Sequence, residues 1–269
     1  MNKRVAFIGG GNMACAMVGG LLRQGLSAAD VDVVEPFADA QHKLQTDFGI
    51  TAHAQAGEFL STVGMVIWAV KPQVFKEAAI PVQPFTTSAL HLSVAAGIRS
   101  DSIAQWLGTE RVVRCMPNTP ALIGKGISGL FARPAVGPYD RLWAGDVMSG
   151  TGEFLWLNDE SQLDAVTALS GSGPAYMFYF METMTAAGVA MGLDQAQAHK
   201  LAVATFIGAG ELAKASSDAP DVLRQRVTSK GGTTHAAITS MEESHMKELF
   251  TQALFAAQQR ARELGELLG

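Results

Sequence analysis

The chain has 269 residues, a net charge of −5, 48% hydrophobic residues and only 17% charged residues. This length exceeds the needs of one average domain and suffices to bury a core without disulfides. The charge balance gives no basic footprint for a nucleic acid or an anionic membrane. The low charged fraction favours burial of further surface between subunits, so we expect a homo-oligomer.

The cysteines and the longer apolar stretches indicate the cellular compartment of the protein. Cys15 and Cys115 lie far apart in apolar stretches, a pattern typical of free, buried thiols in a reducing compartment. Residues 1–4 resemble the start of a signal peptide, but glycines interrupt the following apolar run too early. Residues 173–193 are long enough to cross a bilayer, yet Glu182 near the middle favours a helix buried in protein. We therefore expect a cytoplasmic protein with no membrane association.

Up to about residue 159, short β-rich runs alternate with helical patterns, which indicates βαβ units and a mostly parallel sheet. Strands are expected at 4–8, 31–35, 64–70, 90–95, 111–116, 127–131 and 153–157. Beyond this point helices are expected at 160–169, 174–191, 195–214, 222–227 and 233–240, with a last one to about 264. The pattern predicts an α/β fold, with a Rossmann-like dinucleotide-binding domain at 1–160 and an all-helical domain at 161–269.

A glycine motif joins the first expected strand to a helix expected from Asn12 to about residue 24. The sequence Gly-Gly-Gly-Asn-Met-Ala at 9–14 matches G-x-G-x-x-A. The first glycine permits the tight turn, the second lets backbone approach a pyrophosphate, and the alanine allows close helix packing. Free N–H groups of the helix would face the phosphates. Predicted cofactor residues are therefore Gly9, Gly11, Asn12, Met13 and Ala14; a glycine turn without a ligand is the alternative.

Glu35 ends the second expected strand. An acidic residue here typically binds the ribose 2′-hydroxyl of NAD and would repel the 2′-phosphate of NADP. Glu35 is therefore a predicted cofactor residue that favours NADH, and a solvated carboxylate is the alternative. No arginine lies nearby for a 2′-phosphate, although Lys43 would reach one if its helix were suitably placed.

Three further segments follow expected strands, where open α/β sheets bind ligands. Lys71 would lie over phosphates or ribose, with Pro72 opening the next helix. The small residues at 95–97 would accept a nicotinamide or ribose. Asn118 lies in a loop made rigid by two prolines, which suits presentation of an amide to a nicotinamide or substrate. A structural role is the alternative for each. These predicted cofactor residues are Ala69, Val70, Lys71, Pro72, Ala95, Ala96, Gly97 and Asn118.

The helical half contains a second glycine turn. Residues 227–235 join two helical patterns through Gly231 and Gly232. Backbone N–H groups in such a turn, at a helix N-terminus, can bind a small carboxylate. A simple N-cap by Thr233 or Thr234 is the alternative. The long apolar helix before it, which follows Ser-Gly-Ser-Gly-Pro at 170–174, is expected to form core or subunit interface.

Five segments together resemble the motif set of the pyrroline-5-carboxylate reductases: 9–13, 69–72, 116–120, 171–176 and 229–234. They follow that family's order across nearly the whole chain, and the last segment, led by Pro220, Leu223 and Val227, is the most specific. The resemblance implies an enzyme that reduces 1-pyrroline-5-carboxylate to L-proline with NAD(P)H, the last step of proline biosynthesis. It also implies that the helical domain dimerises, so that one subunit's helical domain faces the cofactor.

The resemblance also implies site roles and a cofactor. Backbone amides around Gly231, Gly232 and Thr233 would hold the substrate carboxylate, with Thr234 near the ring nitrogen as the catalytic residue. The implied substrate-binding residues are Ser229, Lys230, Gly231, Gly232, Thr233 and Thr234. The family typically prefers NADPH, but Glu35 stands where small or polar residues are commoner, so NADP(H) is expected with NAD(H) still open. Imine reduction requires little acid–base machinery, so positioning and electrostatics can supply much of the rate, and the six histidines show no zinc-like spacing.

Two other functions compete with this one. A β-hydroxyacid dehydrogenase has a similar build but relies on a lysine in the helix after its glycine motif; here Met177 and Met181 occupy that face, and no lysine follows until Lys200. A protein that senses dinucleotides without turnover is the second alternative. The second glycine turn, with its two threonines, argues against it.

Overall fold

The computed structural model describes residues 4–268 and divides into two compact units. The first contains the chain up to Ser172 and again from Ala257, and the second is Gly173–Ala256. The predicted boundary near residue 160 therefore lies inside the first unit, to which the end of the last helix also belongs. Residues 1–3, where the signal-like segment starts, lie outside the described part of the chain, as does residue 269.

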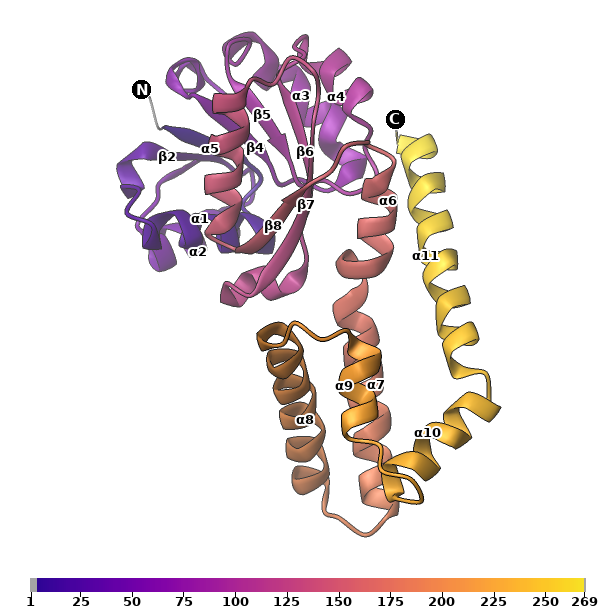
Figure 1. The fold of residues 1–269 in the computed structure, drawn as a ribbon. Coiled ribbons are helices and arrows are strands. Elements are labelled where there is room, and N and C mark those ends of the chain that lie inside the picture. Colours follow the sequence, from indigo (N-terminus) through magenta and orange to yellow (C-terminus); the bar gives the residue numbers. More distant parts are fainter. Residues whose placement is uncertain (1–3, 269) are drawn as a thin grey trace. The chain divides into compact units, whose positions relative to one another are not determined.

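An eight-stranded sheet forms the centre of the first unit, in the order β3-β2-β1-β4-β5-β6-β7-β8 (Figure 1). Neighbouring strands from β3 to β6 are parallel, β7 is antiparallel to β6, and β8 is parallel to β7. The mostly parallel α/β fold is thus confirmed. The strands are β1 (Val5–Ile8), β2 (Val31–Val34), β3 (Ala52–His53), β4 (Met65–Trp68), β5 (Leu90–Ser93), β6 (Val112–Met116), β7 (Gly126–Ala132) and β8 (Gly152–Trp156). The two-residue β3 is too short to give a sequence signal.

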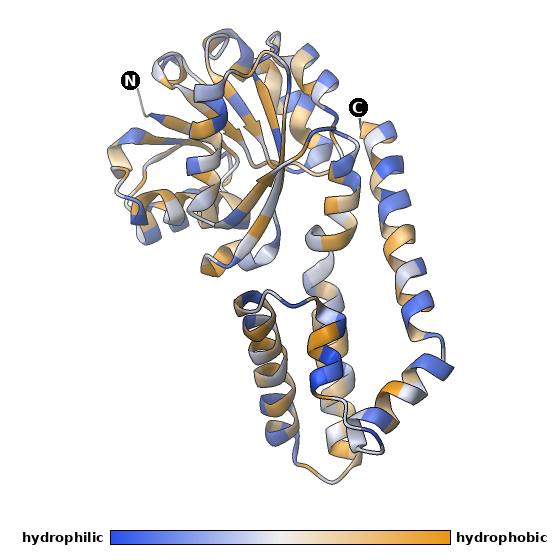
Figure 2. Cartoon of the chain, viewed as in Figure 1, coloured by the Kyte–Doolittle hydropathy of each residue, from blue (hydrophilic) through white to orange (hydrophobic). Residues whose placement is uncertain are grey.

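Helices cover both faces of this sheet, which explains why the central strands are apolar throughout. Phe7 packs in one buried cluster with Met17 and Leu44, whereas Ala6 and Ile8 face a second cluster that contains Phe75. Figure 2 shows the hydrophobic colouring along these strands. The α-helices are α1 (Asn12–Arg23), α2 (Ala38–Phe48), α3 (Phe75–Val82), α4 (Ser100–Leu107), α5 (Pro138–Ser149) and α6 (Gln162–Val166); the short 3-10 turns are η1 (Ala28–Asp30), η2 (Glu58–Thr62), η3 (Pro72–Val74), η4 (Gln83–Phe85) and η5 (Thr119–Ile123).

The segment 160–171 differs from the single helix expected there. The helix α6 begins only at Gln162, and Thr167–Gly171 forms a π-helical turn, η6. Such turns are rare in proteins as a whole, but those that occur are often found at functional sites. The Gly and Ser residues at 170–173 do not predict this π-helical turn, because they are ordinary loop residues.

The second unit consists of α7 (Gly173–Ala190), α8 (Gln195–Ala215), α9 (Pro220–Arg226), α10 (Thr233–Glu243) and the first half of α11 (Met246–Leu268). The long apolar helix was expected to form core or subunit interface, and within one chain it is not core: in α7 only Thr185 and Gly188 are buried, and Phe178 and Tyr179 are more than 60% exposed. No helix among the described residues is long and apolar enough to cross a membrane. Exposed apolar surface of this extent is typical of interaction sites.

Candidate functional site

The sheet order brings most predicted cofactor residues to one edge. In β2, β1, β4 and β5 the chain runs in one direction, so their carboxyl ends lie side by side (Figure 1). Strand order reverses at β1, which lies between β2 and β4. Ligands in open α/β sheets bind at such a reversal. Glu35, the glycine turn, residues 69–72 and residues 95–97 all follow these strands directly.

The first glycine turn is locked in place. Gly9 has a φ of +95°, and a Cβ there would lie 2.8 Å from the carbonyl oxygen of Ala69. Its N–H donates to the Val34 carbonyl at 2.8 Å. Gly11 is different, since a Cβ on it would meet nothing within 4 Å. It is the N-cap of α1, where no side chain caps the helix and the first turn holds no acid, so the open N–H groups are available to a phosphate.

Glu35 is not the solvated carboxylate of the alternative interpretation, because it is only 6% exposed. Its Oε2 accepts the Gly10 N–H at 2.7 Å, and its Oε1 accepts the Phe37 N–H at 2.9 Å. The carboxylate therefore fastens the glycine turn to the end of β2. The two backbone donors also stabilise its negative charge.

The next two loops follow β4 and β5. Pro72 is the first residue of η3, as predicted, and Lys71 is its exposed N-cap. Gly97 has a φ of +77°, and a Cβ on it would lie 3.3 Å from Cβ of Leu264 in α11. The end of α11 thus packs on this loop. The sequence did not predict this contact, because the pattern of an amphipathic helix does not identify the distant segment against which the helix packs.

Asn118 is held by hydrogen bonds within the first unit. Its side-chain oxygen accepts the Ile127 N–H at 3.0 Å, and its amide donates to the Ser170 carbonyl at 3.1 Å. The side chain is 9% exposed. These two hydrogen bonds join the start of β7 to the π-helical turn and give Asn118 a structural role, while its contact with a ligand stays a prediction.

The sequence analysis also did not predict a cluster of charged and polar side chains close to the loop at 95–97. Arg114 contacts Glu160 at 2.6 Å, and the same carboxylate accepts the N–H and hydroxyl of Ser100 at 2.6 and 2.5 Å. Burial alone would raise the pKa of Glu160, but the hydrogen bonds from Ser100 and Arg114 outweigh it and hold the pKa below its ordinary value. Glu160 thereby caps α4 from a distance and fixes the chain just after residues 95–97.

The second glycine turn begins α10. Gly232 N–H donates to the Ser229 carbonyl at 3.0 Å, which closes a turn with Gly231 at a φ of +75°. Gly232 is the N-cap, and no side chain caps the helix. The alternative that Thr233 or Thr234 is merely a capping threonine is therefore wrong. Thr234 is half-buried and its neighbours are mostly exposed, so the first N–H groups of α10 remain open to an anion.

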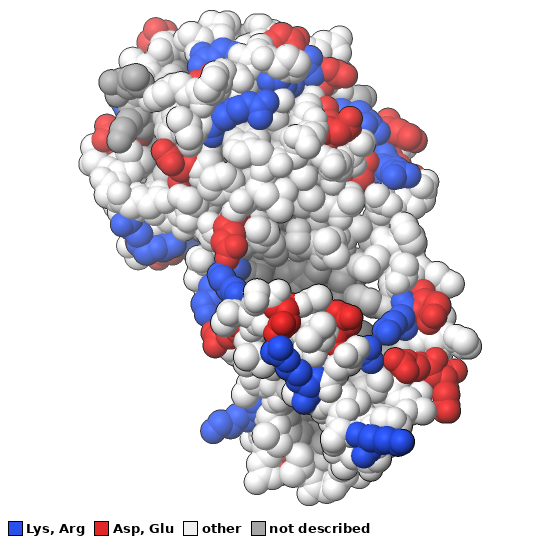
Figure 3. All heavy atoms as spheres, viewed as in Figure 1, with Lys and Arg blue, Asp and Glu red and all other residues white. Residues whose placement is uncertain are grey.

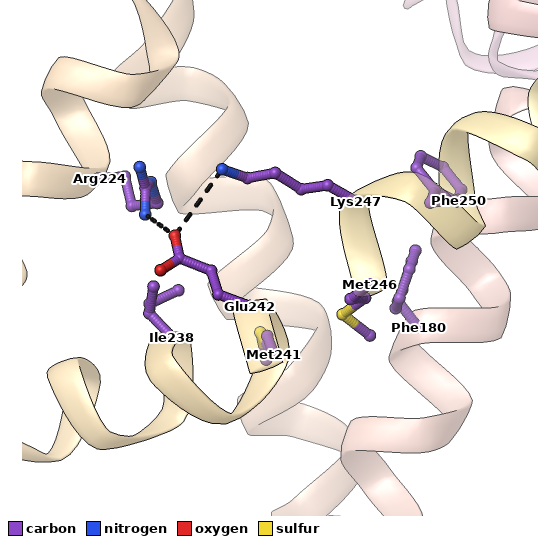
Figure 4. A pocket seen from close by; sticks show the side chains of 8 residues that line it. All are labelled: Phe180, Arg224, Ile238, Met241, Glu242, Met246, Lys247 and Phe250. Carbon is purple, nitrogen blue, oxygen red and sulfur yellow. Dashed lines mark hydrogen bonds and ion pairs between the residues drawn. The ribbon is translucent and has the colours of Figure 1, made fainter. Parts of the chain in front are cut away.

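An apolar hollow of about 200 Å³ lies elsewhere in the second unit, toward the other end of α10 (Figure 4). Glu242 at its rim binds Arg224 at 3.2 Å and Lys247 at 3.8 Å. The other lining residues are Phe180, Ile238, Met241, Met246 and Phe250. None of the predicted site residues lines it.

Surface charge, thiol reactivity and metal-ligating side chains give no second candidate site among the described residues. On the face shown in Figure 3, Lys and Arg are intermingled with Asp and Glu among wide uncharged areas. Both cysteines are free, as predicted. Burial raises the pKa of the Cys115 thiol to about 12 and that of Cys15 above its usual value, so neither is an activated nucleophile. Among residues 4–268 no three His, Cys, Asp or Glu side chains form a metal-binding group.

A glycine turn with an open helix N-terminus at the strand-order reversal of a parallel sheet defines a Rossmann-like dinucleotide-binding protein. Comparisons with known proteins identify the family. A model described as "Pyrroline-5-carboxylate reductase dimerisation" matches residues 160–264, and one described as "NADP oxidoreductase coenzyme F420-dependent" matches residues 4–97. The chain is similar to the pyrroline-5-carboxylate reductase of Pseudomonas aeruginosa, with 45% identity over 99% of this chain and 98% of the relative.

Solved structures agree. A pyrroline-5-carboxylate reductase from Coxiella burnetii has a TM-score of 0.92 and 35% identity over 98% of this chain and 99% of that one. The Plasmodium falciparum enzyme, solved with NADP bound, has a TM-score of 0.87 and 26% identity over 98% of each chain. The chain belongs to the pyrroline-5-carboxylate reductase family, which confirms the resemblance inferred from its motifs.

Proposed function

We propose that this enzyme reduces 1-pyrroline-5-carboxylate to L-proline with NADP(H). The observation that carries the assignment is the uncapped N-terminus of α10, preceded by the turn at Gly231 and Gly232, in a chain that also has an uncapped glycine turn for a dinucleotide. Most other helices among the described residues also lack a side-chain cap, and α8, where Asp194 accepts the Gln197 N–H at 2.8 Å, is an exception, so the glycine turn before the helix is what distinguishes α10. Helix ends left open in this way suit two anions, a pyrophosphate and a carboxylate.

The cofactor supplies a hydride when bound, and the residues of this chain hold and orient it. Gly11 and the first N–H groups of α1 would take the pyrophosphate, with Gly9, Asn12, Met13 and Ala14 shaping the turn. Lys71 would lie over phosphate or ribose, and the remaining residues of 69–72 and 95–97 would lie against the rest of the cofactor. The Plasmodium relative, solved with NADP bound, supports the choice of cofactor.

The substrate would bind at the second turn. Backbone N–H groups of Gly231, Gly232 and Thr233 would hold the carboxylate, with Ser229 and Lys230 forming the rest of the turn. Thr234 would then place its hydroxyl near the ring nitrogen. A protonated imine is already electrophilic, so orientation and this hydrogen bond would account for much of the rate.

The direct test measures NADPH oxidation by the purified chain with 1-pyrroline-5-carboxylate, with formation of L-proline measured in parallel. A β-hydroxyacid serves as the competing substrate with NADP⁺. We expect turnover only with the imine. Turnover of the β-hydroxyacid would favour the dehydrogenase alternative, and tight dinucleotide binding without any turnover would favour a sensor.

We further propose that Glu35 lets the enzyme use NADH beside NADPH. Its carboxylate, held by the Gly10 and Phe37 N–H groups, can accept a ribose 2′-hydroxyl and repels a 2′-phosphate. In Glu35→Ser, the ratio of kcat/KM for NADPH to that for NADH should rise about tenfold, which corresponds to about 1.4 kcal/mol. Asp39→Ser, which removes a nearby acid from the first turn of α2, is the matched control. An unchanged ratio in Glu35→Ser would remove this residue from cofactor choice.

Finally, we propose that a second copy of the chain covers α7. The matching dimerisation model spans this helix, which carries the exposed side chains Met177, Phe178, Tyr179, Met184 and Val189. The helical unit of one subunit would then face the cofactor of another. Light scattering should show a dimer or a larger homo-oligomer, and the free thiols fit a cytoplasmic location. A monomer at micromolar concentration would contradict the assembly.

A further inference from the structure

Phe37 is an exposed aromatic side chain at the cofactor edge of the sheet. It is 72% exposed and stands two residues after Glu35, where β2 ends and α2 begins (Figure 1). Its ring belongs to neither hydrophobic cluster of the first unit. A single exposed apolar residue is ordinary by itself, so the argument depends on how the backbone of Phe37 is held.

The backbone of Phe37 is tied to the glycine turn. Its N–H donates to Oε1 of Glu35 at 2.9 Å, and Oε2 of the same carboxylate accepts the Gly10 N–H at 2.7 Å. The Phe37 carbonyl accepts the Gln41 N–H at 3.0 Å, and the Gln41 side chain donates to the Glu35 carbonyl at 2.5 Å. Pro36 further restricts the link. The ring therefore projects from a backbone of fixed position beside the turn that receives the pyrophosphate.

We propose that Phe37 is the stacking platform for the adenine of the bound dinucleotide. The inference rests on the proposed function, which places the ribose at Glu35; the base attached to that ribose lies next along the end of β2. An exposed aromatic face can stack on a purine ring, and this stacking uses only the π-face of the base. A neutral ring does not sense the 2′-phosphate, so Phe37 contributes equally to NADPH and NADH, in contrast to Glu35.

This equality gives the test. In Phe37→Ala, the Kd values of NADPH and NADH, measured by titration of cofactor fluorescence, should rise by the same factor, about tenfold. Turnover with reduced nicotinamide mononucleotide, which lacks the adenosine, should be unchanged. The F37W variant should restore affinity, and its added indole fluorescence should be quenched by adenosine 2′,5′-bisphosphate. Ile80→Ala, which removes a 70% exposed apolar side chain from α3, is the matched control.

Unchanged Kd values for both dinucleotides in Phe37→Ala would overturn the proposal, as would an equal loss of turnover with the mononucleotide. The binding of adenosine 2′,5′-bisphosphate requires no imine. An enzyme that binds this fragment through Phe37 but fails to reduce 1-pyrroline-5-carboxylate would refute the proposed substrate and leave the stacking intact.

Discussion

The two glycine turns of this protein both precede a helix, but their structural supports differ widely. The first is enclosed: Gly9 lies under the Ala69 carbonyl, and Gly10 is fastened by Glu35 and covered by Leu44. The second has one backbone hydrogen bond across it, from Gly232 to Ser229, and a Cβ on Gly231 would meet nothing within 4 Å. The difference indicates that the first turn is preformed by the sheet, whereas the second turn, where we propose that the substrate binds, depends mainly on its own local geometry.

The largest expected effect separates the two uses of glycine within the first turn. Gly9→Ala forces a left-handed backbone, at a cost of about 1–3 kcal/mol, and also drives its Cβ toward the Ala69 carbonyl. We expect clear loss of stability in thermal unfolding. Gly11→Ala meets open space, so its Tm should stay near wild type while the Kd for NADPH rises about a hundredfold, or about 3 kcal/mol. Normal NADPH affinity in a well-folded Gly11→Ala variant would contradict the phosphate site.

The buried interior of the first unit should also respond to acid. His91 in β5 is fully buried; it accepts the Trp68 Nε1–H at 3.1 Å and its Nε2 lies 3.1 Å from the Thr86 carbonyl. Burial lowers the pKa of His91 from 6.5 to about 4. The unfolded chain therefore binds this proton first as pH falls, so the stability that His91 contributes is complete above pH 6.5 and is lost progressively toward pH 4.

Between pH 6.5 and 5 this loss should reach about 2 kcal/mol. Urea unfolding at fixed protein concentration measures it, with His91→Gln as the variant that cannot titrate. The variant should be less stable at pH 7 yet lose less on acidification. His235→Gln, which removes an exposed histidine in α10, is the control. Parallel pH profiles for wild type and His91→Gln would show that the buried imidazole is not the acid-sensitive group.

The second turn is tested by its threonine. Thr234→Ala should lower kcat/KM for the imine about fivefold to tenfold, the effect of one lost hydrogen bond of roughly 1 kcal/mol. Thr234→Ser should retain most of the activity because it keeps the hydroxyl. Ser240→Ala, an exposed hydroxyl farther along α10, controls for the loss of a polar group from this helix. Full activity in Thr234→Ala would exclude the contact with the ring nitrogen.

The two turns also differ in what sequence reasoning can reach. Both were predicted, because Gly-x-Gly after a strand and Gly-Gly before a helix have local physical causes. The roles of Glu160, Leu264 and Asn118 were not, because each depends on a partner more than 50 residues away or on a hydrogen bond that the local pattern does not specify. The same limit applies to α7, whose composition indicates burial but cannot say whether its own chain or another provides it.

The smallest expected effect concerns the far end of α10. The first unit places glycine at its left-handed positions, for example Gly49 and Gly108, but His245, between α10 and α11, has a φ of +53° and is the one non-glycine residue with positive φ among residues 4–268. Glycine adopts this conformation without the Cβ penalty. His245→Gly should therefore raise stability by about 0.5–1 kcal/mol, measured as a small increase in Tm, whereas Ser244→Gly, at a φ of −85°, should not. A lower Tm for His245→Gly would mean that contacts of the imidazole outweigh the strain, and that the second unit is more tightly determined than its exposed turn suggests.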